Sequence, residues 1–228
     1  MNQRPGFPVK LPVAGATSFV RRGPSGPGLA KASATAAPVT SLQRAWPALT
    51  GLGLDSGAVR ARMVSKLAEQ GLKDPLVLQA MGMVERHRFV DSALVNQAYE
   101  DTSLPIGLGQ TISKPNVVAR MIALLREAPG LQGAQLMGRV LEIGTGCGYQ
   151  AAVLACVARE VYSIERLRGL HDKARDNLRP MRLPNVHMIF GDGMLGYAQG
   201  APYSAIISAA GGENVPQAWM DQLAMGGR

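Results

Sequence analysis

The segment LEIGTGCGYQ, residues 141–150, decides how this chain folds. An apolar run at 139–143 leads into three glycines spaced two residues apart, and a second apolar stretch follows at 149–158. Glycines permit a tight turn and bring backbone N–H groups close to a ligand, and a helix N-terminus favours an anionic group. The pattern therefore predicts a buried strand, a loop and a helix. Taken alone, such a loop is equally compatible with a structural turn or with another nucleotide.

The same alternation continues toward the C-terminus. Apolar runs at 160–165, 185–190 and 203–210 predict strands, and the segment 168–180 predicts a helix that ends at Pro180. Strands separated by helices of this length imply right-handed crossovers and parallel pairing. We therefore predict an α/β fold: a doubly wound, mostly parallel sheet with helices on both faces.

Toward the N-terminus the sequence predicts three helices and a loop. Apolar positions at helical spacing favour helices at 60–71, 75–84 and 115–128. Asp74 is the expected N-cap of the second, because a proline follows it in the first turn. The segment between the second and third helices, YEDTSLPIGLGQTIS (99–113), is rich in turn-forming residues and is predicted as a loop.

The first 55 residues differ in composition from the rest of the chain. They are rich in Pro, Gly, Ala and Ser, and residues 1–54 contain six basic residues and no acidic one, out of a formal net charge of +8. Such a segment buries too little apolar surface to offset the entropy lost on ordering. We expect a disordered basic extension at 1–55 and one domain at 56–228. Because the charge lies mainly in this extension, we do not expect nucleic acid as a partner.

Two acidic residues follow the next strands at positions that suit a nucleoside ligand. Glu165 ends the second predicted strand, where a doubly wound fold places an acid against ribose hydroxyls. Asp192, in the GDG after the third strand, is placed to meet an adenine edge. The loop spacing differs from the Gly-x-Gly-x-x-Gly of dinucleotide sites, and no P-loop lysine follows. The combination points to S-adenosylmethionine as cofactor.

The remaining composition excludes several classes of protein. No apolar run reaches the roughly 18 residues of a membrane helix. The two cysteines, Cys147 and Cys156, fit neither a disulfide framework nor a zinc site. We therefore expect a cytoplasmic protein without a bound metal and without membrane association.

Several segments together resemble the protein-L-isoaspartate O-methyltransferase family, from about Arg60 to the last residue. They are AYEDTSLPIGLGQTIS (98–113), LEIGTGCGYQAAVLA (141–155), VYSIE (161–165), GDG (191–193), APYSAI (201–206), VP (215–216) and QLAMGGR (222–228). The GQTIS segment is specific to this family among methyltransferases of this fold. The resemblance implies a Rossmann-like methyltransferase fold and methyl transfer from S-adenosylmethionine to the α-carboxylate of L-isoaspartyl residues in damaged proteins and peptides.

The resemblance also implies the site residues. Ser113 is the expected catalytic residue, and SAAGG (208–212) is expected to help form the acceptor pocket. The expected cofactor-binding residues are Thr111, Ile112, Ser113, Glu142, Gly144, Thr145, Gly146, Gly148, Glu165, Arg166, Asp192 and Gly193.

The implied chemistry agrees with the residues present. A carboxylate acceptor is ionised at neutral pH, so the reaction needs no general base, and none of the three histidines lies in these motifs. Ser113 is then expected to orient the acceptor by hydrogen bonding. A second interpretation makes Ser113 the N-cap of the helix that begins near Pro115.

The sequence departs from the family pattern in a few places. Glu85 stands where the family usually has proline, Ser204 where it has aspartate, and Cys147 where serine is common. The family continues beyond the position of Arg228 with a fifth strand and an antiparallel hairpin, so we expect a domain truncated at its C-terminus. We expect a monomer. Two alternatives stay open: a methyltransferase acting on RNA or a small molecule, and a non-catalytic cofactor-binding module.

Overall fold

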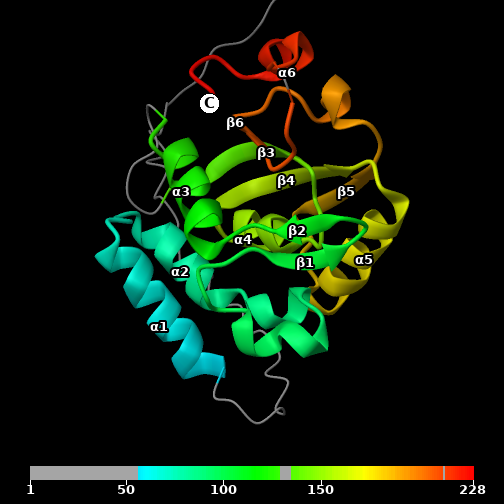
Figure 1. The fold of residues 1–228 in the computed structure, drawn as a ribbon. Helices are drawn as coiled ribbons and strands as arrows, with labels where there is room; N and C mark the ends of the chain where they lie inside the picture. The colour runs from blue at the N-terminus through cyan, green and yellow to red at the C-terminus, as the bar shows by residue number, and fades with distance from the viewer. Residues whose placement is uncertain (1–55, 129–134, 213) are drawn as a thin grey trace, which may run out of the picture. The chain divides into compact units, whose positions relative to one another are not determined.

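The computed structural model describes residues 56–128, 135–212 and 214–228 (Figure 1). The predicted extension at 1–55 lies outside the described residues. Within these ranges, no helix has both the length and the apolar character needed to cross a membrane.

A four-stranded parallel sheet forms the centre of the domain, as predicted. The strands are β3 (Met137–Ile143), β4 (Ala158–Glu165), β5 (Val186–Phe190) and β6 (Ala205–Ser208). Their order in the sheet is β5-β4-β3-β6, and every neighbouring pair is parallel. Because β3 is central and the chain winds outward from it in both directions, the carboxyl ends of all four strands meet at one edge.

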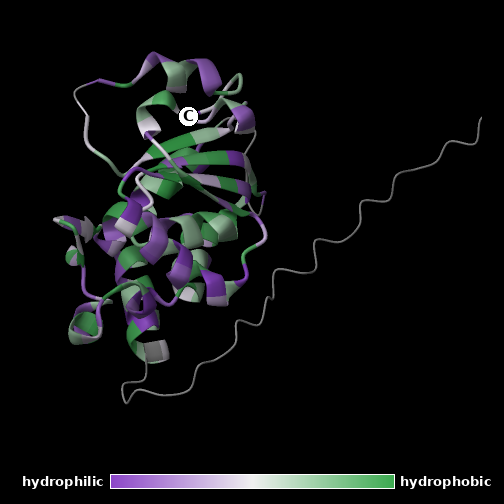
Figure 2. Ribbon diagram, turned by 90° about the vertical axis from the view of Figure 1, so that its right-hand side faces the viewer, coloured by the Kyte–Doolittle hydropathy of each residue, from purple (hydrophilic) through white to green (hydrophobic). Residues whose placement is uncertain are grey.

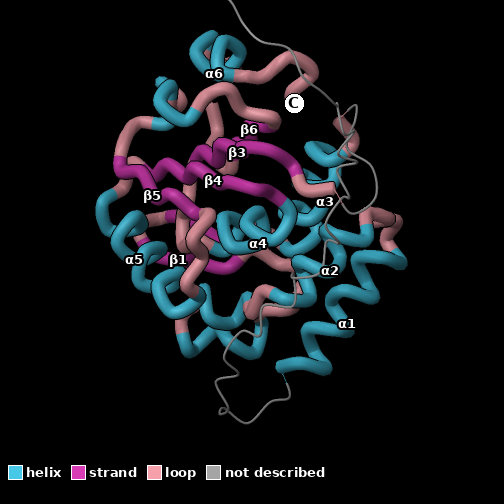
Figure 3. The backbone as a smooth tube through the Cα atoms, turned by 180° about the vertical axis from the view of Figure 1, so that it is seen from behind, coloured by secondary structure: helices cyan, strands magenta, loops and turns pink. Residues whose placement is uncertain are grey.

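The longer helices cover one face of this sheet. They are α3 (Pro115–Arg126), α4 (Tyr149–Val157) and α5 (Arg168–Leu178), with η3 (Arg179–Met181) continuing from α5. Val140 and Val161 point from the strands into a shared core with Leu154 of α4. Figure 3 shows α4 and α5 on one side of the sheet and α6 on the other. Figure 2 shows hydrophobic residues along the strands, interrupted by hydrophilic ones, and both kinds of residue on the helices.

Short helices cover the opposite face. They are η4 (Gly193–Leu195), η5 (Ala198–Gly200) and α6 (Gln217–Gln222). Alternate strand residues, Leu141, Ile143 and Ile164, form a second core with Tyr203, and Trp219 of α6 packs against it. Helices on both faces were predicted, and the two layers differ in thickness.

The N-terminal helices pack outside α3 and α4. They are α1 (Ser56–Glu69), α2 (Pro75–Met83), η1 (Arg86–Phe89) and η2 (Ser92–Gln97). The predicted cap of α2 is confirmed: Asp74 Oδ1 accepts hydrogen bonds from the N–H groups of Leu76 and Val77 at 2.9 and 3.0 Å.

The loop predicted at 99–113 is wrong in part, because it contains a β-hairpin. Strands β1 (Leu104–Gly107) and β2 (Gln110–Ile112) pair antiparallel. Leu104, Ile106 and Ile112 are buried, whereas the tip residues are exposed. The turn-forming residues of this segment therefore mark a hairpin turn between two short strands that bury apolar side chains.

Candidate active site

A cavity of about 500 Å³ opens at the carboxyl ends of the parallel strands. Its walls are the glycine loop after β3, the ends of β4 and β5, the segment after β6, and the hairpin. Most of the predicted site residues line this cavity: Thr111, Ile112, Ser113, Gly144, Thr145, Gly146, Glu165, Arg166, Asp192 and Gly193. The volume lies in the range typical of pockets that hold small organic ligands.

The alternate glycines of the loop are explained by its backbone conformation. Gly144, Gly146 and Gly148 have φ values of 87°, 57° and 91°, in the left-handed region that other residues rarely adopt. The loop is also tightly covered, since a Cβ on Gly146 would lie 3.2 Å from Ile106 Cδ1 of the hairpin. Alternate glycines therefore let the loop turn sharply beneath the hairpin.

Glu165 joins the end of β4 to the glycine loop. It is buried, and its Oε2 accepts a hydrogen bond from Gly146 N–H while Oε1 accepts one from Leu167 N–H, both at 2.9 Å. A carboxylate has about four acceptor positions, so these bonds leave capacity for hydroxyl donors in the cavity. The same side chain can hold the loop and bind a ligand.

Asp192 and Gly193 lie at the end of β5. Asp192 Oδ1 accepts a hydrogen bond from Met194 N–H at 3.0 Å and so caps η4. A Cβ on Gly193 would lie only 2.5 Å from Ile143 Cγ2, so only glycine fits there without a shift. Trp219 Nε1–H donates to Gly193 O at 2.7 Å and ties α6 to this corner of the cavity.

Ser113 follows β2 directly and lines the cavity half-buried. The interpretation of Ser113 as a helix cap is wrong, because the N-cap position of α3 is Lys114 and no side chain of that residue caps the helix. Asp101 Oδ1 instead accepts the hydrogen bond from Asn116 N–H at 3.0 Å. Among the hydrogen bonds of the described residues, none involves the Ser113 hydroxyl, which is therefore available to a ligand.

The segment Ser208–Gly212 forms the wall opposite the hairpin. It lies against the glycine loop, since a Cβ on Gly144 would lie 3.4 Å from Ala210. Ser208 Oγ–H donates to Ala210 O at 2.9 Å and fixes the turn after β6. Its short side chains keep this side of the cavity open.

Two predicted site residues lie behind the cavity wall. Gly148 packs under Leu178 at the start of α4, and Glu142 is fully buried. Ser163 Oγ–H donates to Glu142 Oε2, and a second hydrogen bond of 2.6 Å links the Ser163 and Thr145 hydroxyls. Burial raises the pKa of Glu142 to about 8. Glu142 is therefore protonated at neutral pH and reaches the cavity only through Ser163 and Thr145.

Some lining residues were not among the predicted site residues, although two of them lie in the segment 98–113 that carries the resemblance. Ile106 and Gln110 come from the hairpin, and Trp219 comes from α6. Alternation of Leu104 and Ile106 next to Gly107-Leu108-Gly109 is a weak hairpin signal that could have located the first two. Trp219 could not have been found, since its place depends on how α6 folds back over the sheet.

The described residues hold no group of His, Cys, Asp and Glu side chains arranged to bind a metal ion. Cys147 is a buried thiol, and burial raises its pKa. The polar groups at the cavity include backbone N–H groups, hydroxyls, carboxylates, the amides of Gln110, Gln150 and Asn214, and the exposed Arg166.

A parallel sheet with a glycine loop, two acids and a cavity at its carboxyl edge defines a Rossmann-like methyltransferase fold. A family model described as "Protein-L-isoaspartate(D-aspartate) O-methyltransferase" matches residues 58–228. The chain belongs to this family.

Curated relatives agree with this assignment. The chain is 65% identical over 180 residues to protein-L-isoaspartate O-methyltransferase from Leptothrix cholodnii, covering 79% of the chain and 62% of the relative. It is 63% identical over 178 residues to the protein of the same name from Methylibium petroleiphilum, covering 78% and 65%. The chain thus spans less than two thirds of the length of these relatives.

Solved structures show the same fold. One, named protein-L-isoaspartate O-methyltransferase, has a TM-score of 0.65 at 30% identity, covering 74% of this chain and 53% of the other. A putative member from Plasmodium falciparum, in complex with S-adenosyl-L-homocysteine, has a TM-score of 0.61 at 21% identity and covers 72% and 79%.

Proposed function

We propose that this chain is the cofactor- and acceptor-binding part of a protein-repair methyltransferase. Its cofactor is S-adenosylmethionine, and its acceptor is the α-carboxylate of an L-isoaspartyl residue in a damaged protein or peptide. The observation that carries the proposal is the single cavity that joins the glycine loop, Glu165 and Asp192 to the family's GQTIS serine, Ser113. Membership of the family and the printed names of the relatives support the choice of acceptor.

The cavity residues fit S-adenosylmethionine. Thr145, Glu165 and Asp192 all line the cavity. We propose that the loop at 144–148 and the hydroxyl of Thr145 bind the methionine end, that Glu165 binds the ribose hydroxyls and that Asp192 binds the adenine amino group. When bound, the cofactor supplies an electrophilic methyl group on a sulfonium.

The chain's own residues have then to align the acceptor. A carboxylate oxygen forms the new bond to the methyl carbon, and the carbon–sulfur bond breaks with its electron pair retained by sulfur. No proton moves, because the acceptor is ionised at neutral pH. Ser113 hydrogen-bonds and orients the acceptor, the hairpin excludes water, and Ser208–Gly212 leave room for a peptide chain.

The proposal extends to localisation, oligomeric state, metal content and partners. We propose that the protein acts in the cytoplasm as a monomer without a metal ion, with damaged proteins as its partners. A non-catalytic module or an RNA methyltransferase are the competing functions, and the cavity favours neither over the family's reaction.

The test is transfer of labelled methyl from S-adenosylmethionine to an L-isoaspartyl peptide, with the normal aspartyl peptide and an RNA as comparison acceptors. It should be run on the 228-residue chain and on a version extended with the C-terminal residues of the Leptothrix cholodnii relative. We expect base-labile label on the isoaspartyl peptide alone. Label on RNA, or none from a version that binds S-adenosylhomocysteine, contradicts the proposal.

Two variants and a control assign the residues. Glu165→Gln is expected to weaken S-adenosylhomocysteine binding about tenfold, the effect of losing one charge-assisted hydrogen bond to a ligand. Ser113→Ala is expected to lower transfer about tenfold with cofactor binding nearly unchanged. Ser65→Ala, on an exposed position of α1 far from the cavity, is the matched control and should change neither.

A further inference from the structure

One lysine fastens the hairpin to the helix that follows Glu165. Lys173, on α5, donates a hydrogen bond from Nζ to the carbonyl oxygen of Ile106 at 2.8 Å. The same Nζ lies 3.1 Å from Asp91 Oδ1. The lysine thus bridges the acid of one segment and the backbone of another, with its side chain 30% exposed.

The carbonyl that Lys173 holds belongs to an irregular point in the hairpin. Pro105 pairs with Thr111 and Gly107 with Gln110, so the register shifts at Ile106. The extra residue of a bulge is left outside the ladder, and bulges near functional sites change the direction of the strand. Lys173 therefore donates a hydrogen bond to the carbonyl oxygen of Ile106, the residue at which the strand pairing is interrupted.

The side chain of Ile106 sets the height of the hairpin above the glycine loop. It is 2% exposed, lines the cavity and packs over Gly146. At the tip, Leu108 lies beside Gly169, where a Cβ would be 3.1 Å from Leu108 Cδ1. In Figure 1, the hairpin extends across the domain toward α5. The hairpin is thus held at its bulge and at its tip by the first half of one helix.

We propose that Lys173 is a positioning residue for the acceptor. By fixing the bulge, it fixes the pairing that places Thr111 and Ile112 and, one residue further on, Ser113. This inference rests on the proposed function, because the consequence of the position is the alignment of acceptor and methyl group. Asp91 restrains the lysine side chain and so supports the same arrangement.

The lysine is expected to affect the acceptor more than the cofactor. The glycine loop and Glu165 hold each other through the hydrogen bond from Gly146 N–H to Glu165 Oε2, so we expect them to keep their positions when the Lys173 contact is lost. Ser113 belongs to the hairpin, and small displacements of a positioning group lower catalytic rates steeply. A change at Lys173 should therefore separate transfer from cofactor binding.

The kinetic experiment compares Lys173→Met, Lys173→Arg and Asp91→Asn with Lys66→Met as control, because Lys66 is an exposed helical lysine on α1. For Lys173→Met, we expect kcat/KM for the isoaspartyl peptide to fall about tenfold, with S-adenosylhomocysteine affinity within about twofold of the unmodified chain. Lys173→Arg should recover most of the loss, and Asp91→Asn should cost about twofold, as an exposed ion pair does. The proposal would be overturned if Lys173→Met had a lower melting temperature but an unchanged kcat/KM when assayed well below that temperature.

A second measurement does not depend on activity. Hydrogen–deuterium exchange of residues 104–112 should accelerate in Lys173→Met and not in Lys66→Met, while exchange in α4 stays the same. Unchanged exchange at 104–112 overturns the positioning role even if transfer is absent throughout. If the protein without the Lys173 substitution binds S-adenosylhomocysteine but transfers no methyl group, the repair function is refuted, and faster exchange in Lys173→Met would still support the hairpin anchor.

Discussion

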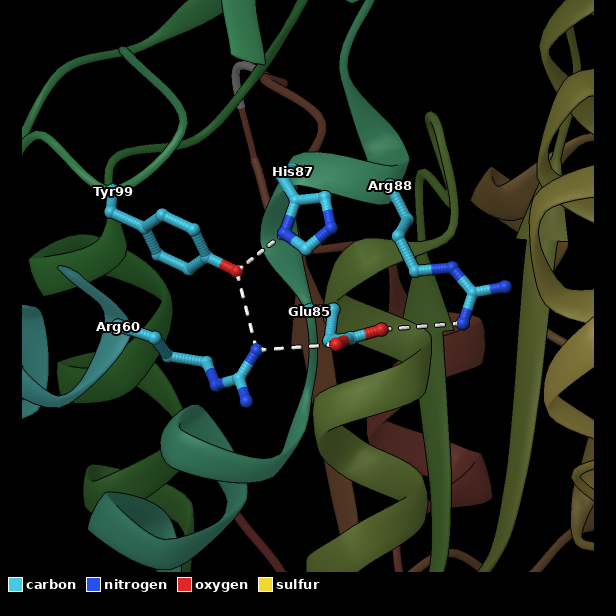
Figure 4. Close-up of polar contacts among 5 residues, drawn as sticks. All are labelled: Arg60, Glu85, His87, Arg88 and Tyr99. Atoms are coloured by element: carbon cyan, nitrogen blue, oxygen red, sulfur yellow. Dashed lines mark hydrogen bonds and ion pairs between the residues drawn. The ribbon is translucent and has the colours of Figure 1, made fainter. Parts of the chain in front are cut away.

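Two polar networks in this domain contain similar groups in very different surroundings. Behind the glycine loop, Glu142, Ser163 and Thr145 form a chain of hydrogen bonds that is almost fully shielded from water. Between α1 and η1, Arg60 and Arg88 share Glu85, with side chains 16–21% exposed (Figure 4). We infer from this difference that burial, more than the number of charged groups, decides how much each network changes the free energy of unfolding.

The inner network offers few hydrogen bonds that could stabilise a negative charge on the buried Glu142 carboxyl group. Glu142 Oε1 has no hydrogen-bond partner within ordinary distance, and neither has Gln150 Nε2, although Gln150 lies near enough to lower the pKa of Glu142 slightly. Burial is the larger effect and raises that pKa to about 8. Protonation removes the charge that the protein could not otherwise stabilise.

The outer network is less deeply buried, with side chains 16–21% exposed. Arg60 Nη1 lies 3.5 Å from Glu85 Oε1, and Arg88 Nη1 lies 3.4 Å from Glu85 Oε2. A hydrogen bond of 2.7 Å joins His87 Nδ1 to the Tyr99 hydroxyl beside them. Water and salt screen such pairs, so each is expected to contribute little.

The largest expected effect comes from Glu142→Gln. The folded pKa of about 8 exceeds the ordinary value of 4.5, so the wild-type carboxyl contributes stability that is fully present below pH 4.5 and is lost as the pH rises toward 8. The variant lacks this loss. At pH 8 it should therefore be more stable than the unmodified chain by up to about 5 kcal/mol, and equally stable near pH 4. Urea unfolding across this pH range measures the difference.

Glu160→Gln is the control for that experiment. Glu160 lies on the neighbouring strand β4 with its side chain 42% exposed beside His187. Its variant should keep the pH dependence of the unmodified chain. If the two variants behave alike, Glu142 is ionised in the folded protein and the inner network is no different from a surface one.

Arg86→Ala is expected to have the next largest effect. Arg86 is fully buried; its Nε–H donates to Ala98 O at 2.7 Å and its Nη2–H to Thr102 O at 3.4 Å. Burial lowers its pKa, and the Tyr149 ring lies 4.8 Å from its guanidinium carbon. Truncation leaves a cavity and carbonyls without donors, so unfolding should become easier by about 4 kcal/mol.

Two further variants separate the causes of that loss. Arg86→Met keeps most of the volume, so the part of the loss that it retains reports the missing hydrogen bonds. Arg88→Ala, two residues away in η1, removes a half-buried arginine and should cost less than about 1 kcal/mol. Equal losses at positions 86 and 88 would contradict the claim that burial decides the cost of removing a charged side chain.

The sequence predicted the parts of the fold that depend on local patterns. Alternating apolar runs predicted β3 to β6 and the helices between them, and a proline after Asp74 predicted the cap of α2. The hairpin was missed because its strands are only four and three residues long. Such short strands, surrounded by turn-forming residues, show no clear alternation of apolar and polar residues.

Features that depend on tertiary packing could not be predicted. Glu142 was expected at the cofactor because it lies in the glycine motif, yet alternation along β3 directs its side chain toward the helices. Arg86 gave no signal, since a single arginine in a short segment is usually exposed. Lys173 likewise acquires its contact only when α5 and the hairpin pack together.

Tyr99→Phe tests the two hydrogen bonds that the Tyr99 hydroxyl makes, with His87 and with Arg60 (Figure 4). Burial raises the pKa of Tyr99, so its hydroxyl stays neutral in its hydrogen bond with His87. Loss of the hydrogen bond with His87 and of the longer one from Arg60 at this half-buried site should lower the free energy of unfolding by about 1–2 kcal/mol. Tyr197→Phe removes an exposed hydroxyl that donates to Gln199 and should cost less. A loss above that of Arg86→Ala would contradict the larger cost expected for the more deeply buried side chain.

Glu85→Gln is expected to have the smallest effect on stability and the clearest spectroscopic one. Burial already holds the pKa of His87 below 6.5, and Glu85 acts against this while Arg60 and Arg88 add to it. Without the Glu85 charge, the pKa of His87 should fall further, as an NMR titration of the ring would report. A folded pKa below the unfolded value means that stability is lost as the pH falls below 6.5, so the variant's deficit should grow on acidification. At neutral pH the loss of unfolding free energy in Glu85→Gln should stay below about 1 kcal/mol. The control Glu100→Gln changes an exposed acid and should leave the His87 titration unchanged. A loss of several kcal/mol in Glu85→Gln at neutral pH would mean that water does not screen the outer network.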